Sequence, residues 1–74
     1  PEMQFDYVIA NINRNIITAD IDRYAMVLRK GGKMLLSGFY EEDIPVVLAS
    51  AAPLGLTELL HNVKNRWTML LLTK

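Results

Sequence analysis

The chain has 74 residues, of which 51% are hydrophobic, and its eight basic residues balance eight acidic ones. This length allows one small domain, which would bury only about 60% of its unfolded surface. The balanced charge lacks the basic footprint of a nucleic-acid-binding protein, and the absence of cysteine excludes disulfides and thiolate metal sites.

The ends of the chain point to a piece of a longer cytoplasmic protein. The apolar run from Met69 to Leu72 is too short to span a bilayer, and the start shows no signal-peptide pattern. The first residue is Pro1 instead of a methionine, so we expect the chain to be cut from something longer. Its high apolar content then predicts surface that meets a partner or a missing part of the protein.

Phe5 to Ile12 has the sequence FDYVIANI, an apolar run rich in β-branched and aromatic residues that closes on a polar asparagine. Such a run predicts a strand buried on both faces of a sheet. In open parallel α/β sheets, ligands bind outside the carboxyl ends of the strands. Asn11 is therefore well placed for ligand contact.

A helical pattern follows this strand. Apolar residues recur at steps of three and four, which predicts one stripe of an amphipathic helix, formed by Ile17, Ile21, Tyr24, Ala25 and Leu28. Asn15 is the predicted N-cap. Asp20 and Asp22 come early in the helix and Arg29 and Lys30 late, an order that complements the helix dipole.

A second strand is predicted for Lys33 to Phe39, after the pair Gly31-Gly32 has ended the helix in a left-handed conformation. Roughly twenty residues separate the two strands, which suits a crossover helix but not a hairpin. The strands should therefore lie parallel, with a right-handed connection. Their carboxyl ends, Asn11 and Ser37-Gly38, then fall on the same edge of the sheet.

A second helix is predicted next. The acidic run Glu41 to Asp43 suits a helix N-terminus, and Pro45 is tolerated in a first turn. Val46 to Ala52 is strongly apolar. Pro53 should end this helix, because the residue before a proline avoids helical angles.

The remaining residues predict a hairpin. Leu54-Gly55 turns the chain, and two strands, Leu56 to Val63 and Trp67 to Thr73, follow around the short connection Lys64 to Arg66. The last strand becomes continuously apolar and should be central in the sheet. The predicted fold is α/β, in the order β-α-β-α-β-β, with two parallel strands and a terminal antiparallel hairpin.

Asn11 is the strongest candidate for ligand binding. An asparagine after a strand is often only a turn former, but its amide can both donate and accept hydrogen bonds at the ligand edge. Ser37 is expected to line the same crevice as a contact residue. No base accompanies it, so it is not a candidate nucleophile, and we assign no catalytic residue.

Other polar residues have structural explanations. His61, the only histidine, lies in the terminal hairpin and away from this edge, so neither a metal nor a catalytic role is expected. Residues 29–33 lack the spacing of a phosphate loop. The acidic run 41–43 suits a solvated helix start better than a metal cluster, and Trp67 is expected to pack in the sheet.

Taken in order, these residues resemble a known family. FDYVIANI resembles the fourth strand and following motif of class I S-adenosylmethionine-dependent methyltransferases, and more closely the family that methylates the eleventh protein of the large ribosomal subunit. That family shows a second asparagine four residues on, like Asn15, and a Gly-Gly turn into hydrophobic-Ser-Gly, like Gly31-Gly32 and Leu36 to Gly38. An acidic helix start follows, then a late hairpin with a tryptophan, like Trp67. The likeness runs across almost all 74 residues.

The resemblance implies that residues 1–74 are the C-terminal part of a Rossmann-like methyltransferase catalytic domain, whose N-terminal cofactor-binding half is absent. It implies S-adenosylmethionine as cofactor and amino groups of a ribosomal protein as substrate. Asn11 would contact the methyl donor or lie beside it, near the amine. The chain alone is then expected to be inactive and to self-associate. Asn13 and Ile16 depart from the family pattern, which commonly has an apolar residue and a proline there.

Other functions remain open at this point. One is methyl transfer to another substrate, and another is a non-catalytic α/β module that binds a protein through its open sheet edge. An upstream strand followed by G-x-G-x-G, with an acidic residue roughly twenty positions on, would support a methyltransferase.

Overall fold

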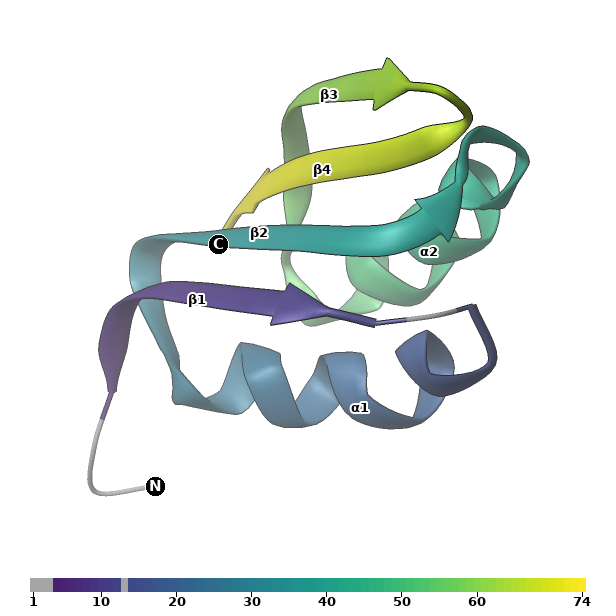
Figure 1. Ribbon diagram of the computed structural model, residues 1–74. Helices are drawn as coiled ribbons and strands as arrows, with labels where there is room; N and C mark the ends of the chain where they lie inside the picture. The colour runs from purple at the N-terminus through teal and green to yellow at the C-terminus, as the bar shows by residue number, and fades with distance from the viewer. Residues whose placement is uncertain (1–3, 13) are drawn as a thin grey trace.

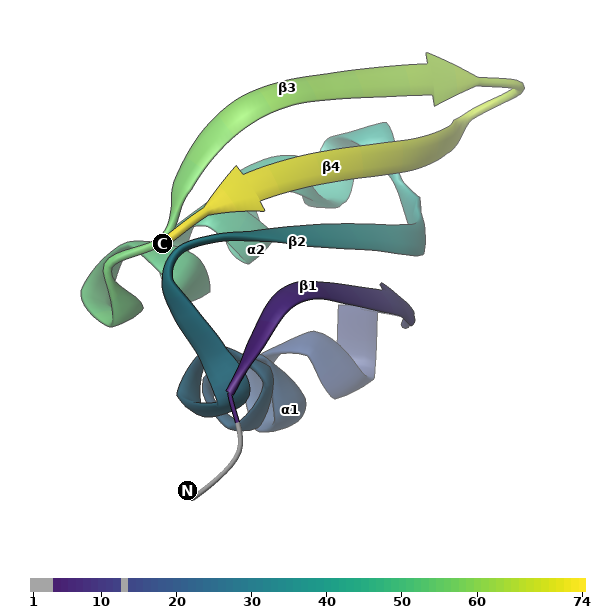
Figure 2. The same cartoon turned by 90° about the vertical axis from the view of Figure 1, so that its left-hand side faces the viewer.

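The computed structural model describes residues 4–12 and 14–74, with the backbone alone for 14–19, and within these ranges a four-stranded sheet packs against two helices. Both helices cover the same face of the sheet, so the molecule has two layers and the other face is open (Figures 1 and 2). The elements are β1 (Phe5–Asn11), α1 (Arg14–Val27), β2 (Leu28–Tyr40), α2 (Ile44–Ala51), β3 (Thr57–Lys64) and β4 (Trp67–Thr73). None of the described helices is both long and apolar enough to cross a membrane.

The sheet has the strand order β1-β2-β4-β3. β1 and β2 are parallel, whereas β4 is antiparallel to both of its neighbours. This confirms the predicted α/β order, the parallel pair and the terminal hairpin. The continuously apolar β4 is an inner strand, as expected.

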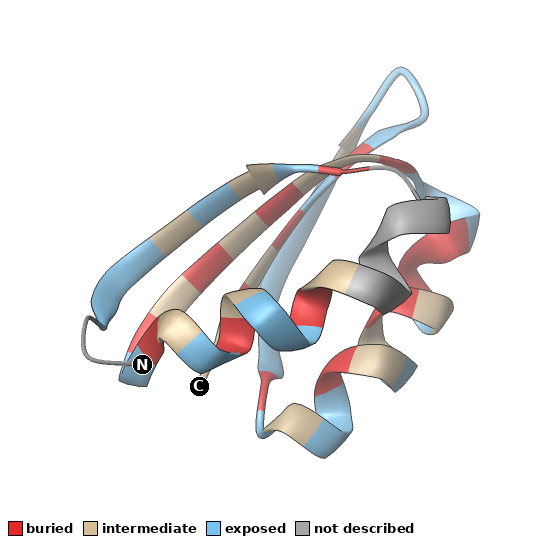
Figure 3. Ribbon diagram, turned by 90° about the horizontal axis from the view of Figure 1, so that it is seen from below, coloured by how far each residue is buried: buried red, intermediate tan, exposed pale blue. Residues whose placement is uncertain are grey.

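The hydrophobic core lies between the sheet and the helices, where buried bands of both layers face one another (Figure 3). Alternate residues of β2 and β4 point toward the helices, because successive side chains of a strand alternate between its two faces. Among the fully buried members are Met34, Leu36, Val47, Ala51, Leu70 and Leu72.

The first strand differs from its prediction. β1 is an edge strand, and the side chains of Tyr7 and Ile9 on the open face are 72% and 77% exposed. Val8 and Ala10 pack against the core from the helix-covered face. The expectation of a strand buried on both faces is therefore wrong for this chain, because only one face of the sheet carries helices (Figure 1).

The predicted start of the first helix was also misplaced. α1 begins at Arg14, so Asn15 lies inside its first turn and not at the N-cap. Asn13 is outside the described residues. Asp20 and Asp22 are mid-helix, and no acidic residue occupies the first turn.

The predicted end of α1 was wrong as well. The helix ends at Val27, and Gly31-Gly32 lies inside β2. Leu28 is fully buried and pairs with Phe5, so sheet formation takes the chain out of the helix before the glycines. A Cβ on Gly32 would lie 2.9 Å from the carbonyl oxygen of Asp6, which shows how closely β1 approaches there.

A distant residue caps the end of α1. Lys74 Nζ donates hydrogen bonds to the carbonyl oxygens of Ala25 (2.6 Å) and Leu28 (3.0 Å). Its positive charge therefore meets the negative end of the helix dipole. This is the role that the sequence suggested for Arg29 and Lys30, which instead are exposed in β2.

The second helix begins largely as predicted. Glu41–Asp43 forms a short 3-10 turn, and α2 follows with Pro45 in its first turn. The reason given for its end was wrong, because Ala52, the residue before Pro53, keeps helical angles of φ −56° and ψ −45°. Ala52–Leu54 continues as a 3-10 turn and is closed by Gly55 in a left-handed conformation.

The hairpin turn is tighter than expected. Only Asn65 and Arg66 connect β3 to β4, and both have positive φ, 51° and 73°. This combination is typical of the two-residue turns whose twist matches that of the flanking strands. The turn brings Arg66 beside the pocket edge described below.

Candidate functional site

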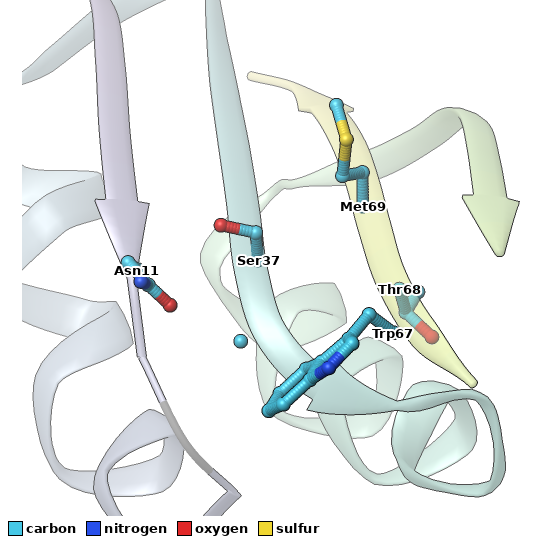
Figure 4. A pocket seen from close by; sticks show the side chains of 6 residues that line it. Asn11, Ser37, Trp67, Thr68 and Met69 are labelled. Carbon is cyan, nitrogen blue, oxygen red and sulfur yellow. The ribbon is translucent and has the colours of Figure 1, made fainter. Parts of the chain in front are cut away.

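A pocket of about 260 Å³ opens at the edge of the sheet where β1 and β2 end. Because β4 is antiparallel to β2, the start of β4 reaches the same edge. Its described lining is formed by Asn11, Ser37, Gly38, Trp67, Thr68 and Met69 (Figure 4). Three strands that are far apart in sequence therefore meet at the ligand edge of an α/β sheet.

Asn11 and Ser37, the two predicted site residues, are brought together. They are register partners in the parallel β1–β2 pair. Their side chains point toward one another across the gap between the strands (Figure 4). The backbone holds this arrangement, because the N–H of Ile12 donates to the carbonyl oxygen of Ser37 at 2.7 Å.

Gly38 allows the Asn11 side chain to lie close against β2. Its φ is +96°, and a Cβ there would overlap the amide oxygen of Asn11 and lie 2.6 Å from the carbonyl oxygen of Ile12. The β2–β4 pairing is also irregular between Ser37 and Phe39. Sequence reasoning placed Gly38 at the strand end without giving it a role, although a glycine there often marks a bulge or a close approach.

Trp67 was expected to pack in the sheet, and this holds only in part: it is the first residue of β4 but is not buried there. Its side chain is 54% exposed and lines the pocket. The indole stacks on Tyr40, with ring centroids 5.3 Å apart and an angle of 21° between the rings. The tryptophan after a hairpin turn therefore contributes an aromatic wall to the pocket.

The described lining carries no ionisable side chain. Asn11 and Ser37 offer hydrogen-bonding side chains, and the remaining surface is mainly apolar or backbone. The Thr68 hydroxyl is buried without a hydrogen-bond partner among the described residues, and it is turned away from Asn11 (Figure 4). The site can therefore orient a neutral group, but none of these side chains is suited to exchange a proton with it.

Apart from Trp67, the residues that the sequence analysis set aside do not line this pocket. His61 is on β3, the strand at the opposite edge from β1, and its Nδ1 donates to Glu58 Oε2 at 2.8 Å. Residues 29–33 lie at the other end of β2. No group of three metal-binding side chains occurs in the part of the chain that the structure describes.

The comparisons with known proteins agree with one another. The family described as "Ribosomal protein L11 methyltransferase (PrmA)" matches residues 1–74. The chain is 49% identical over 69 residues to the ribosomal protein L11 methyltransferase of Porphyromonas gingivalis, covering 93% of the chain and 24% of that protein. It is 48% identical over 63 residues to that of Bacteroides fragilis, covering 85% of the chain and 22% of that protein.

A solved structure has the same fold. The ribosomal protein L11 methylase of Lactobacillus delbrueckii subsp. bulgaricus superimposes with a TM-score of 0.88 at 23% sequence identity. The match covers 99% of this chain and 38% of that one. The chain thus spans about a fifth to a quarter of the length of the curated relatives it matches.

Proposed function

The chain belongs to the ribosomal protein L11 methyltransferase family, and we propose that residues 1–74 form the C-terminal part of the catalytic domain of an S-adenosylmethionine-dependent methyltransferase. The complete enzyme would act in the cytoplasm on amino groups of a large-subunit ribosomal protein. The observation that carries this proposal is the pairing of Asn11 with Ser37 beside a pocket at the carboxyl edge of the sheet. The other wall of the cofactor site would come from the complete protein, so the chain alone would be inactive.

The positively charged methyl donor would bind at this pocket. The described lining holds no cationic side chain that would repel such a group. Asn11 would hold the donor by hydrogen bonds, and Ser37 would line the substrate side. When bound, S-adenosylmethionine supplies a methyl group on a sulfonium that is ready for displacement.

The same residues would orient the amine. The amide oxygen of Asn11 accepts a hydrogen bond from an amine N–H, which leaves the nitrogen lone pair free to form the new C–N bond. The amine reacts in its neutral form, because only that form has a lone pair on nitrogen, and a proton leaves the methylated nitrogen for water after transfer. Catalysis in this scheme consists mainly of positioning.

A transfer assay tests the proposal. The complete enzyme, labelled methyl donor and isolated large-subunit ribosomal proteins are incubated together, and the labelled protein is identified by mass spectrometry. We expect label on amino groups of one such protein. Label on carboxylates, on nucleic acid or on no ribosomal protein would contradict the proposed substrate class.

One observation favours a second candidate function, the binding of a protein partner through β1. This strand is an edge, and Tyr7 and Ile9 on it are strongly exposed. They line an apolar hollow of about 310 Å³ on the open face, together with Val8, Lys33, Leu35 and Leu71. A complete protein that binds a partner through this strand and shows no methyl transfer would favour this candidate.

A further inference from the structure

A chain of contacts links the hairpin turn to the wall of the pocket. The Trp67 indole lies in the pocket lining and stacks on Tyr40. The guanidinium carbon of Arg66 lies 5.3 Å from the centroid of the Tyr40 ring, and Arg66 Nη2 lies 3.7 Å from Glu42 Oε1. Tyr40 is therefore the common neighbour of an aromatic ring and a cation.

The backbone of the β2–β4 pair and of the hairpin turn places these side chains next to one another. Tyr40 and Trp67 are register partners at the end of the β2–β4 pair. The two-residue turn holds Arg66 at φ 73°, a left-handed conformation that is uncommon for a residue with a side chain. This conformation sends the chain back so that Arg66, the residue before Trp67, reaches Tyr40. Glu42 lies two residues after Tyr40, in the 3-10 turn that follows β2, and forms the ion pair with Arg66.

The stack matters because Trp67 is only half covered. An indole that is 54% exposed has solvent on one side, and without a neighbour it would sample several rotamers. Stacked aromatic pairs favour one geometry beyond the area that they bury. The exposed ion pair of Arg66 with Glu42 is screened by solvent, so we expect it to contribute less than the Tyr40 stack to holding the Trp67 indole in place.

We propose that Tyr40 is a positioning residue, supported by Arg66 and Glu42, that fixes the Trp67 indole as the wall along which the alkyl part of the substrate amine lies. This inference rests on the proposed function, in which the pocket receives an amine-bearing side chain. Asn11 would hold the nitrogen, and Trp67 would hold the apolar stem. Tyr40 touches neither of them and acts through Trp67.

The first test uses Trp67 as its own reporter, since it is the only tryptophan of the 74-residue chain. Tyr40→Leu should shift its emission to longer wavelength, increase quenching by acrylamide and reduce the near-ultraviolet circular dichroism. Tyr40→Phe keeps the ring and should resemble the wild type. Far-ultraviolet circular dichroism checks that each variant is folded. Unchanged Trp67 emission and quenching in folded Tyr40→Leu would overturn the inference.

The second test measures kinetics in the complete enzyme. Tyr40→Leu should raise KM for the protein substrate about three- to tenfold, the range expected for losing an aromatic pair. The kcat of Tyr40→Leu and its KM for the methyl donor should stay within about twofold of the wild type. All kinetic constants of Tyr40→Phe should stay within the same range. A variant in which kcat alone falls, or in which Tyr40→Phe is as impaired as Tyr40→Leu, would overturn the positioning role.

A matched pair of arginine variants gives an answer even where Tyr40→Leu does not fold. Arg66→Met removes the cation over Tyr40, whereas Arg23→Met removes an equally exposed arginine from the Asp20 ion pair on α1. Only Arg66→Met should increase quenching of Trp67 and raise KM for the protein substrate. Equal effects of the two variants would contradict the inference. An intact wild type without methyl transfer would instead contradict the proposed function.

Discussion

The amide oxygen of Asn11 occupies the space that a Cβ on Gly38 would need. Asn11 ends β1, and Gly38 sits beside its register partner Ser37 on β2, so the contact joins the ends of two parallel strands. An arrangement this close makes the shape of the pocket depend on a residue with no side chain.

Gly38→Ala should therefore damage both stability and the pocket. A side chain at φ +96° is strained, which costs on the order of 1–3 kcal/mol, and its Cβ also meets Asn11 and the backbone of Ile12. Urea unfolding of the chain measures the first effect, and methyl transfer by the complete enzyme measures the second. Gly55→Ala is the control, because Gly55 has a φ of +80° with nothing within 4 Å of its Cβ position. Equal losses at the two glycines would mean that the contact with Asn11 has no energetic consequence.

Asn11→Ala in the complete enzyme should weaken cofactor binding or slow transfer by roughly 1–3 kcal/mol, the effect of losing a hydrogen-bond partner. Unfolding should be little changed, because the side chain is exposed. Asn62→Ala and His61→Ala are controls, since both residues are exposed on β3 at the opposite edge of the sheet. Full activity and affinity in Asn11→Ala, or a loss beyond about tenfold (roughly 1.4 kcal/mol) in folded His61→Ala, would contradict our assignment of the site.

Lys74→Met should destabilise the chain by about 1–2 kcal/mol, because two carbonyl groups at the end of α1 lose a charged donor. Chemical denaturation at fixed protein concentration provides the measurement. Lys30→Met serves as the control, since Lys30 is exposed in β2. Comparable unfolding midpoints for the two variants would show that Lys74 is not the functional cap of this helix.

Methyl transfer should accelerate with pH. Only the neutral amine has a lone pair to form the new bond, so kcat/KM should rise about tenfold per pH unit below the amine pKa. The rise should end at about pH 10.4 for a lysine side chain and at about pH 8 for an α-amino group. The pH profile thus identifies the amine. A bell-shaped profile centred near neutrality would instead point to a general base in another part of the complete enzyme.

The isolated 74-residue chain should self-associate and bind S-adenosylmethionine weakly or not at all. Register pairs across the open face align Ile9, Leu35, Leu71 and Leu60 in one aliphatic row that ends at the unpaired edge of β1. Exposed edges of this kind pair readily with other strands. Sedimentation velocity over a concentration series measures association, and calorimetry measures cofactor binding.

A charged side chain on β1 tests whether the edge of this strand causes the self-association. Ile9→Lys should reduce association, because edge lysines oppose strand pairing. Met26→Lys places the same charge at an exposed position on α1 and should have little effect. A stable wild-type monomer at high concentration, with micromolar affinity for the cofactor, would refute two proposals. These are that β1 is an edge that drives association and that part of the cofactor site lies elsewhere in the complete protein.

Much of the topology could be predicted from the sequence alone. Apolar periodicity and the distance between runs determine which segments form strands and whether neighbours can be parallel, so the β-α-β-α-β-β order was predictable. The same logic brought Asn11 and Ser37 to one edge, because parallel strands end together. These features depend on local pattern and chain length, both of which are present in the sequence.

Other features depended on contacts between residues distant in the chain. Leu28 joins the sheet and ends α1 early, and Lys74 caps that helix from 46 and 49 residues away. Trp67 lies in the pocket lining and stacks on Tyr40, which is distant in the chain. Such outcomes follow from packing and from hydrogen bonds formed across the fold, where the burial of one side chain can outweigh the local preference of a turn or cap.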